Sequence, residues 1–517
     1  MSHYGAVAAG HPLTADAAEL ILRAGGNAFD AILAAHFAAC VAEPVLASLG
    51  GGGFMLARPA DAPAQVFDFF VQTPAHKRPA DELDFYPIVA DFGTAQQEFH
   101  IGLGAIATPG SVRGMFDIHR LLGSLPMSEI VAPAIGYARD GVSLNAFQAY
   151  LFSVVAPIYS ATQQAHNIFG SDKPAGVMVG DDDVLCLPEL AGILGLLAIE
   201  GDNLFYRGEI AQAIVQQCKT GGGHLDLSDM ENYQVIHRQP LSVNYRDVQY
   251  LTNPPPSSGG LLIAFALKLL ETADLSKRGF GSVDHLQFLT EVMAATNKAR
   301  LDAHVESGAS STEMTHMLDP VFVDLYRREI HDRAVAQRGT THISVMDNQG
   351  NAAAMTVSNG EGCGHIVPGT GMMLNNMLGE EDINPDGFHR WQTNQRMTSM
   401  MAPSLLQWPD GRQVTLGSGG SNRIRTAILQ TLSNLIDFDL DLEQAVTHPR
   451  IHFENCRLSI EDGFDRDELD KLLKNFPDHH LWESHNFFFG GVHAVEHDGK
   501  LFRGVGDQRR GGVSRVV

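Results

Sequence analysis

The stretch GTTHISVMDNQGNAAAMTVSNGEG, residues 339–362, carries the clearest secondary-structure signal in the chain. Two segments that alternate apolar with small polar residues, 341–347 and 351–358, flank the turn sequence Asp-Asn-Gln-Gly. Alternation with a period of two is typical of strands, and a glycine turn between two such segments predicts a β-hairpin. On strand propensity alone, the Thr340-Thr341 pair after Gly339 is an ordinary beginning of a strand.

Helical and strand patterns continue on both sides of this hairpin. We expect helices over residues 14–43, broken at Gly25-Gly26-Asn27, and over residues 110–141. Ser228 and Glu231 have the spacing of a helix start. The sequence predicts strands at 54–58, at 64–73, where Thr73-Pro74 ends the strand, and at 404–408, 412–418 and 491–498. Helices and strands therefore alternate in the first two thirds, and the final third is rich in strands.

Composition and charge indicate a large globular protein that acts on small molecules. The 517 residues are 44% hydrophobic and 19% charged, so the chain can bury a sizeable core. The net charge of -24 and a pI near 5.3 argue against nucleic acid as a partner, because a phosphate-binding surface needs clustered Lys and Arg. Charged residues interrupt the first 44 residues, which predicts neither a signal peptide nor a membrane span. We expect a cytoplasmic protein without membrane association.

Several common site motifs are missing from the sequence. The five cysteines are scattered without CxxC spacing, and the 23 histidines include no HExxH. The glycine-rich segment 48–55 lacks the Lys-Ser/Thr of a phosphate loop, and no GxSxG nominates a serine nucleophile. We therefore expect no metal and no cofactor.

Thr340 is the remaining candidate nucleophile. A threonine hydroxyl needs a base beside it at neutral pH, and the threonine's own α-amine can serve once the preceding peptide bond is cut. Gly339 suits such a cut, because it has no side chain to block attack of the hydroxyl on its carbonyl group. This reading predicts a proenzyme with a large subunit 1–339 and a small subunit 340–517. Spacing alone leaves it open, because Gly-Thr-Thr is a weak motif.

The chain resembles the γ-glutamyltranspeptidase family of N-terminal nucleophile hydrolases nearly from end to end. The matching stretches, in the family's order, are AELILRAGGNAFDA, SLGGGGFML, ATPGSVRGM, YARDG, NPPPSSGG, TTHISVMDNQGNA, GMMLNNM and LGSGGSNRI. The resemblance implies an α+β fold, a four-layer αββα sandwich in which both subunits contribute strands to the two central sheets. It implies one intertwined domain, no cofactor, and leaves open a homodimer of the processed unit.

The resemblance also assigns the catalytic machinery. Thr340 matches the threonine that cleavage after Gly339 exposes, with its new amine as general base. Ser358 matches a family threonine that hydrogen-bonds this amine, and serine keeps the hydroxyl group. Gly420 and Ser421 match the two backbone N–H donors of the oxyanion hole, although the order of residues here differs slightly from the family's Gly-Ser-Pro-Gly-Gly-Ser.

The expected substrate site departs from the family. Phe70 stands where the family has an arginine that clamps the substrate's α-carboxylate, and phenylalanine cannot replace a bidentate guanidinium. Met377 replaces a glutamine. The other substrate-binding positions implied by the resemblance are Asn359, Glu380, Thr398 and Ser399.

These features support three hypotheses. The first is a self-cleaving amide hydrolase or acylase with altered head-group recognition, acting on a small-molecule amide. The second is a true γ-glutamyltranspeptidase or glutathione hydrolase in which another arginine, such as Arg78 or Arg396, supplies the clamp. The third is an uncut, catalytically inactive binding protein, against which the retained Thr340 and Ser358 argue.

Overall fold

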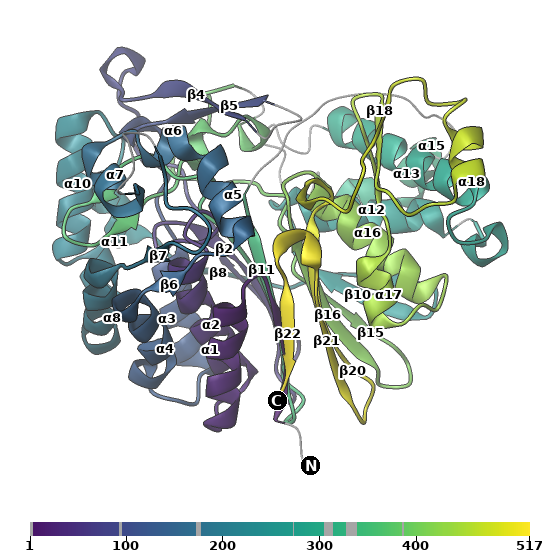
Figure 1. The fold of residues 1–517 in the computed structure, drawn as a ribbon, viewed down its shortest axis with the longest axis horizontal. Helices are drawn as coiled ribbons and strands as arrows, with labels where there is room; N and C mark the ends of the chain where they lie inside the picture. The colour runs from purple at the N-terminus through teal and green to yellow at the C-terminus, as the bar shows by residue number, and fades with distance from the viewer. Residues whose placement is uncertain are drawn as a thin grey trace.

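Two antiparallel β-sheets face each other at the centre of the molecule, with helices on their outer sides (Figure 1). The computed structural model describes residues 4–517 apart from 92–95, 172–176, 272, 304–313, 327–338 and 385–386. The expectation of a mixed fold of helices and antiparallel sheets is confirmed.

The first sheet has seven strands. Their order across the sheet is β22 (Val513–Val516), β1 (Gly5–Ala9), β11 (Thr341–Asp347), β12 (Ala352–Ser358), β2 (Gly52–Arg58), β3 (Gln65–Phe69) and β8 (Ile236–Arg238). The predicted hairpin is its central pair, with Thr341 opposite Val357. Thr340, one residue before β11, therefore lies at the level of Ser358 at the end of β12.

The second sheet has six strands. Their order is β21 (Phe502–Gly506), β20 (Gly491–His497), β16 (Gln413–Gly419), β15 (Ser404–Gln407), β10 (Val248–Thr252) and β9 (Leu241–Tyr245). Strand β11 of the first sheet packs against β16 and β20 of the second. Segments before and after residue 339 contribute strands to both sheets, and β1 lies between two strands of the later segment, β22 and β11.

Helices cover the outer face of each sheet. The first sheet is covered by α1 (Pro12–Arg23), α2 (Ala28–Ala42) and α3 (Ser111–Leu122), with α4 (Met127–Asp140) and α8 (Pro188–Glu200) packed outside them. The second sheet is covered by α12 (Ser258–Leu270), α16 (Arg423–Ile436) and α17 (Leu442–Thr447), with α13 (Val283–Asp302) against α12.

Shorter elements surround these layers. The other helices are α5 (Ala146–Val154), α6 (Ala156–Tyr159), α7 (Gln163–Phe169), α9 (Asn203–Tyr206), α10 (Glu209–Gly221), α11 (Leu227–Asn232), α15 (Pro320–Tyr326) and α18 (Arg466–Leu472). Small sheets are formed by β4 (Tyr86–Asp91) with β5 (Gln96–Ile101), β6 (Val142–Ser143) with β7 (Val184–Leu185), β13 (Ile366–Val367) with β14 (Met372–Met373), and β17 (Ile451–Glu454), β18 (Arg457–Ile460) and β19 (His479–Leu481).

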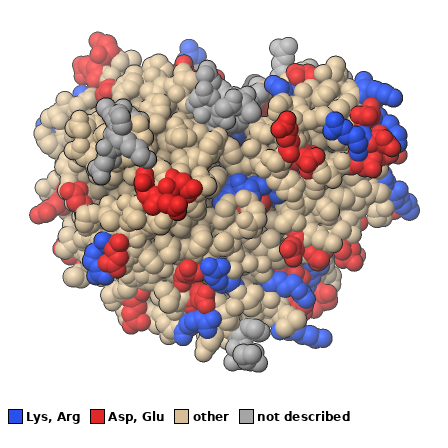
Figure 2. All heavy atoms as spheres, in the orientation of Figure 1, with Lys and Arg blue, Asp and Glu red and all other residues tan. Residues whose placement is uncertain are grey.

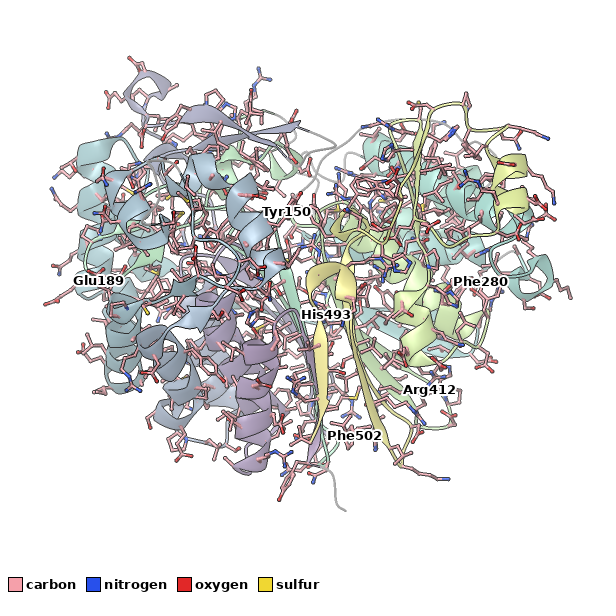
Figure 3. All side chains as sticks on the ribbon, in the orientation of Figure 1. Tyr150, Glu189, Phe280, Arg412, His493 and Phe502 are labelled. Atoms are coloured by element: carbon pink, nitrogen blue, oxygen red, sulfur yellow. The ribbon has the colours of Figure 1, made fainter. Side chains whose placement is uncertain are left out.

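The hairpin is buried on both faces, and the alternation of side chains along each strand determines which residues lie on which face. Ile343 and Val345 of β11 belong to the apolar core under α1 and α2. Met346 belongs to a smaller core between the sheets that is rich in alanine. Because side chains alternate along a strand, His342 and Ser344 point to the same side as Met346, toward the second sheet. There, His342 Nε2 and Ser344 Oγ are 3.0 Å apart, and Ser344 Oγ donates to the carbonyl of His493. Figure 3 labels His493 at this central position.

Most predicted elements are confirmed, and three predicted boundaries are wrong. The helical region 110–141 is two helices, because Gly123 and Pro126 interrupt it. Helix α11 is capped by Asp226, which exchanges hydrogen bonds with Asp229, so the capping box lies two residues before the predicted Ser228 and Glu231. Strand β3 ends at Phe69 rather than at Thr73.

Acidic and basic side chains are interspersed on the face of the molecule shown in Figure 2. No helix within the described ranges is long and apolar enough to cross a membrane.

Candidate active site

The Gly339 peptide is held by side chains on both of its sides. Its carbonyl oxygen accepts hydrogen bonds from Thr340 Oγ1 at 2.7 Å and from Ser358 Oγ at 2.9 Å. Its N–H donates to Glu361 Oε1 at 3.0 Å. The hydroxyl of Thr340 therefore lies against the carbonyl group that self-cleavage would attack, and a second hydroxyl polarises that carbonyl.

The turn after β12 brings Glu361 back to this peptide. Gly360 and Gly362 have φ values of 64° and 96°, a left-handed conformation that glycine adopts without strain. The backbone N–H of Glu361 donates to Asn376 Oδ1 at 3.0 Å, which fixes the turn. The sequence Asn-Gly-Glu-Gly thus places a buried carboxylate beside the candidate scissile bond.

The turn between β16 and α16 lies on the other side of Thr340. Gly420 has a φ of 120° and Ser421 a φ of 52°. A Cβ at Gly419 would lie 2.0 Å from the carbonyl oxygen of Thr340, so the end of β16 can pack against the threonine only as glycine. The turn leads directly into the N-terminus of α16, where backbone N–H groups favour developing negative charge.

Two buried ionisable side chains, Glu43 and Arg510, contact the start of β11. Thr341 Oγ1 and Thr14 Oγ1 donate to the carboxylate of Glu43 at 2.9 and 2.7 Å. Burial raises the pKa of Glu43 to about 7. Arg510 Nη1 lies 3.3 Å from the carbonyl oxygen of Thr340, and burial lowers the pKa of Arg510 to about 10.

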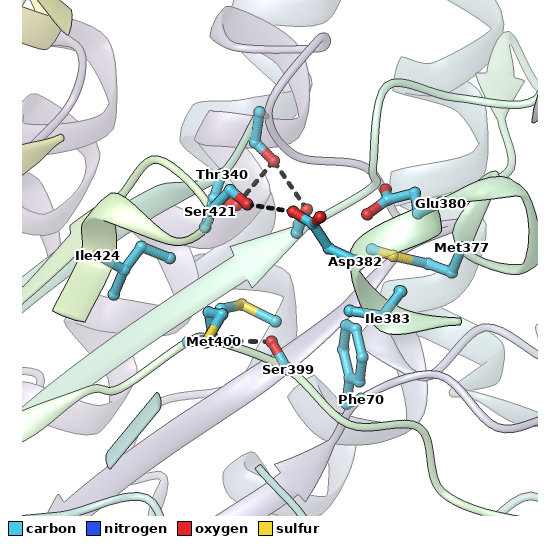
Figure 4. A pocket seen from close by; sticks show the side chains of 13 residues that line it. Phe70, Thr340, Met377, Glu380, Asp382, Ile383, Ser399, Met400, Ser421 and Ile424 are labelled. Atoms are coloured by element: carbon cyan, nitrogen blue, oxygen red, sulfur yellow. Dashed lines mark hydrogen bonds between the residues drawn. The ribbon is translucent and has the colours of Figure 1, made fainter. Parts of the chain in front are cut away.

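A pocket with a volume of about 380 Å³, its open mouth included, opens beside Thr340. Figure 4 shows Thr340, Ser421 and Asp382 together at one end, where Ser421 Oγ donates to Asp382 Oδ2 at 2.9 Å. The lining residues are Phe70, Gly339, Thr340, Ser358, Met377, Glu380, Asp382, Ile383, Ser399, Met400, Met401, Ser421 and Ile424. The wall is mostly apolar, and its charged groups within the described residues are carboxylates.

The pocket brings together most of the residues expected from the sequence. Three of the ten expected positions lie outside its lining: Asn359, Thr398 and Gly420. Thr398 Oγ1 donates to the carbonyl of Pro256 at 2.8 Å, away from the pocket. Asn359 is fully buried, and neither atom of its amide group has a hydrogen-bond partner among the described residues.

Sequence reasoning missed several residues of the site. Asp382, Ile383, Met400 and Met401 line the pocket but stand outside the matching stretches, and Ile424 lines it as the last residue of LGSGGSNRI, although it was not named as a site residue. The acidic run Glu380-Glu381-Asp382 was the available signal for Asp382. Glu361 could have been suspected from its place between two glycines, three residues after Ser358.

The two arginines suggested as alternative clamps lie outside the pocket lining. Arg396 is buried behind Phe70, where its guanidinium contacts the carbonyl of Phe70, the hydroxyl of Tyr233 and, at 3.6 Å, the carboxylate of Asp68. Arg78 donates to the carbonyl of Lys219. Phe70 itself stacks on Phe54 with ring centroids 5.4 Å apart. Within the described part of the chain, no group of three or more His, Cys, Asp or Glu residues is arranged to hold a metal ion.

Comparison with known proteins agrees with this geometry. The family model described as gamma-glutamyltranspeptidase matches residues 14–517. The chain belongs to the gamma-glutamyltranspeptidase family. It is therefore an enzyme of the N-terminal nucleophile type.

Two curated relatives and one solved structure illustrate the similarity. The chain is 30% identical to the Acylase ACY 1 proenzyme of Pseudomonas sp. (strain V22), over 91% of this chain and 86% of that one. It is 28% identical to the Glutathione hydrolase proenzyme of Bacillus subtilis (strain 168), over 99% and 91%. The crystal structure of cephalosporin acylase from Bacillus halodurans superposes with a TM-score of 0.84, at 22% identity and over 99% and 96% of the chains, and shares the fold.

Proposed function

We propose that this protein is a self-cleaving amidohydrolase or acylase that hydrolyses a small-molecule amide through a Thr340 acyl-enzyme. The observation that carries the proposal is the contact of both the Thr340 and Ser358 hydroxyls with the Gly339 carbonyl oxygen. The names of relatives, which include an acylase proenzyme and a glutathione hydrolase proenzyme, support the same chemistry.

Maturation begins with attack of Thr340 Oγ on the carbonyl carbon of Gly339. The C–N bond breaks, an ester forms, and the hydroxyl proton ends on the released α-amine of Thr340. Water then hydrolyses the ester, which gives a carboxylate at Gly339 and restores the Thr340 hydroxyl. Ser358 stabilises the oxyanion of this step, because its hydroxyl already donates to the oxygen on which the charge develops.

Turnover uses the new N-terminus. The α-amine of Thr340 takes the proton of its own hydroxyl, and the hydroxyl oxygen attacks the substrate carbonyl. The amide C–N bond then breaks, the protonated α-amine gives the proton to the leaving nitrogen, and the acyl group stays on Thr340 as an ester. The backbone N–H groups of Gly420 and Ser421, at the start of α16, stabilise the oxyanion. Ser358 then holds the amine, and water releases the acyl group.

The proposed architecture is the four-layer αββα sandwich of the N-terminal nucleophile hydrolases, built from a large subunit 1–339 and a small subunit 340–517. The interleaved strand order of both sheets supports a single intertwined domain.

Recognition of the substrate rests on Phe70 and Met377, which line the pocket where a carboxylate clamp would be needed. Of the substrate-binding positions expected from the sequence, Glu380 and Ser399 are the polar ones in the lining. Asn359, which is fully buried, and Thr398, which is half-buried, lie outside the lining and would act by supporting this wall. The alternative, a true γ-glutamyltranspeptidase, is disfavoured because Arg396 is committed to Asp68 and Tyr233.

The test is cleavage and activity of three proteins, measured by denaturing gels, intact mass and turnover of an amide panel. The wild-type chain is expected to divide between Gly339 and Thr340. Thr340→Ala should stay uncut and inactive, while Thr340→Ser, which keeps a hydroxyl, should still be cut. A wild-type chain that remains whole after long incubation, or a Thr340→Ala chain that divides at the same bond, would overturn the proposal.

A further inference from the structure

Arg510 lies buried against the residue that would supply both the nucleophile and its base. It is 4% exposed and ends a short 3₁₀ helix, Gln508–Arg510, just before β22. Its Nη1 donates to the carbonyl oxygen of Thr340 at 3.3 Å. This carbonyl group belongs to the same residue whose α-amine is released by the proposed cleavage. A cation therefore contacts the backbone of the nucleophile from outside the substrate pocket.

Glycines make room for the guanidinium at this position. A Cβ at Gly419 would lie 3.2 Å from Arg510 Nη1, and a Cβ at Gly420 would lie 3.1 Å from Nη2. At Gly491, a Cβ would lie 2.5 Å from Cδ of the same arginine. Because larger residues at these positions would push the arginine away, the glycines keep its charge directly behind the turn between β16 and α16.

Glu43 is the buried acid that contacts the start of the same strand. Its carboxylate accepts hydrogen bonds from Thr341 and Thr14, and the charge of Arg510 favours its ionised form. Burial raises the pKa of Glu43 to about 7 and lowers the pKa of Arg510 to about 10. Near neutral pH the arginine is therefore charged, whereas the acid is only partly ionised.

The other charged groups around Arg510 do not neutralise it. Asp507 attracts the guanidinium, but its carboxylate forms ion pairs with Arg450 and Arg509. Arg423, at the start of α16, adds a further positive charge that acts on Arg510. The positive charge at the start of β11 is thus balanced mainly by Glu43, and only in part.

Further ionisable groups surround Thr340 within the described ranges. The acids lie on the turn after β12 and on the pocket wall, and they are Glu361, Glu380 and Asp382. The thiol of Cys40 and the imidazoles of His342 and His493 are neutral, because burial raises the pKa of the thiol and lowers the pKa of each imidazole. All of these groups are the same in the variants compared below, so a difference between variants reports on the side chain that was changed.

A cation beside Thr340 acts on its amine. The ordinary pKa of an α-amine is about 7.7–8.0, so an unperturbed amine is mostly protonated at neutral pH and cannot accept the hydroxyl proton. Protonation would place a second positive charge close to Arg510 in a buried site, where like charges repel strongly. The guanidinium therefore favours the neutral amine, and ionised Glu43 opposes this effect.

We propose that Arg510 is a positioning residue that orients Thr340 through its carbonyl oxygen and keeps the released α-amine unprotonated near neutral pH, and that Glu43 limits this effect. The inference rests on the proposed function, because it concerns the amine that the cut releases. It gives a role in turnover to two buried side chains outside the pocket lining.

The first experiment compares the pH profiles of cut enzymes. Values of kcat/KM are measured from about pH 5.5 to about pH 9 with the panel amide that wild type hydrolyses fastest, because the acid limb of this profile reports the base of the free enzyme. In Arg510→Met, which keeps a long side chain without charge, the midpoint of the acid limb should rise by about one pH unit or more. Arg510→Lys restores the charge and should bring the midpoint back toward the wild-type value. A loss of activity in Arg510→Met that is equal at every pH would overturn the inference.

The second experiment uses Glu43→Gln and decides the question even if Arg510→Met does not fold or is not cut. The amide keeps the size of the side chain and an acceptor for Thr341 or Thr14, but it removes the negative charge. The acid limb should therefore move to lower pH by about half a pH unit, opposite to its direction in Arg510→Met. The matched control is Glu381→Gln, because Glu381 is exposed and lies outside the pocket lining. An acid limb that stays in place or moves to higher pH in Glu43→Gln would overturn the inference.

The outcomes separate this inference from the proposed function. If wild type is cut before Thr340 and active, but all variants share its midpoint, the proposed function stands and the role of Arg510 is rejected. A wild-type chain that stays whole and hydrolyses no amide would reject both.

Discussion

Besides Thr340 itself, two side chains hold Gly339, and only one of them was expected from the sequence. Ser358 donates to the carbonyl of Gly339, and Glu361 accepts from its N–H. After cleavage, Gly339 ends in a carboxylate and is no longer joined to Thr340. The contact with Glu361 can therefore position the Gly339–Thr340 bond only in the uncut chain. We infer that Glu361 positions the peptide for self-cleavage and is not needed to the same degree for turnover.

Replacement of Glu361 should therefore slow maturation. Glu361→Ala removes a hydrogen bond to a charged acceptor worth about 1.5–3 kcal/mol, so cleavage should slow about tenfold or more. The fraction of cut chain is followed over time on denaturing gels. Glu361→Gln, which keeps a neutral acceptor, should be slowed less, and Glu381→Ala should mature at the wild-type rate. Cleavage of Glu361→Ala at the wild-type rate, in a protein with unchanged thermal stability, would contradict this role.

Phe70 lines the pocket beside Thr340, and we infer that it helps to select the end group of the substrate. Phe70→Arg places a guanidinium in the wall opposite the nucleophile and gives a carboxylate an opposite charge to bind. We expect the ratio of kcat/KM for the glutaryl anilide to that for the 4-aminobutyryl anilide to rise about tenfold or more relative to wild type. Phe70→Leu is the control, because it shortens the side chain without adding charge. A ratio that changes equally in both variants would show that only the shape of the wall matters.

At this scale the sequence predicted the residues that lie in long motifs. Thr340, Met377 and Ser421 were named because each stands in a matching stretch, and Ser358 was named because it stands where the family has a threonine, six residues after the stretch TTHISVMDNQGNA. Asp382 and Ile424 were missed, because a side chain's approach to a pocket depends on how distant loops pack and not on its neighbours in the chain. Thr398 was expected in the lining, but a hydrogen bond to Pro256 turns it away.

Helix α2 shows how complete burial shapes a whole element. All of its residues are buried, including His36, whose ring lies 3.8 Å from Cys40 Sγ. The hydrophobic run of this helix could be recognised in the sequence. The helix begins after Asn27, which caps it through a capping box with Asp30. A histidine inside such a helix must be neutral, and burial lowers the pKa of His36 to about 4.

This burial predicts a loss of stability in acid. The unfolded chain binds a proton at His36 near pH 6.5, whereas the folded chain resists protonation down to about pH 4. The unfolded state therefore binds more protons between these values, and the free energy of unfolding falls by about 2 kcal/mol from pH 7.5 to pH 5 through this group.

The contribution is isolated by comparison with His36→Leu. Glu43 has a raised pKa and acts in the opposite direction over this range, so the wild-type curve alone does not report on one group. Urea unfolding at pH 7.5 and pH 5 should show a loss of stability that is smaller in His36→Leu by about 2 kcal/mol. An identical pH dependence of both proteins would show that His36 titrates normally.

Element boundaries were predicted where local chemistry sets them and missed where distant partners do. The hairpin of β11 and β12 follows from its own alternation and turn. Strand β3 ends early because the N–H of Phe70 turns to Asp68 and its carbonyl accepts from Tyr233, a residue more than 160 positions away. The sequence around Phe70 contains no pattern that predicts a hydrogen bond from Tyr233.

Across the whole molecule, the strand order is the feature that sequence patterns leave undetermined. The family resemblance implied that both segments share the sheets, but periodicity alone gives no register between strands far apart in the chain. The structure places β1 between β22 and β11, and pairs β12 with β2 and β10 with β15. Each of these ladders joins the segment before Gly339 to the segment after it.

This arrangement predicts that cleavage leaves one folded particle. Separation of the two segments would expose the alanine-rich core between the sheets and the unpaired edges of four ladders, which is costly in water. The cut enzyme should therefore elute from a size-exclusion column at the volume of uncut Thr340→Ala, and it should divide into two fragments only in denaturant. Either segment expressed alone should be insoluble or unfolded, because each lacks the neighbours of its central strands. Elution of the cut fragments at separate volumes without denaturant would mean that the ladders across the cleavage site do not hold the molecule together.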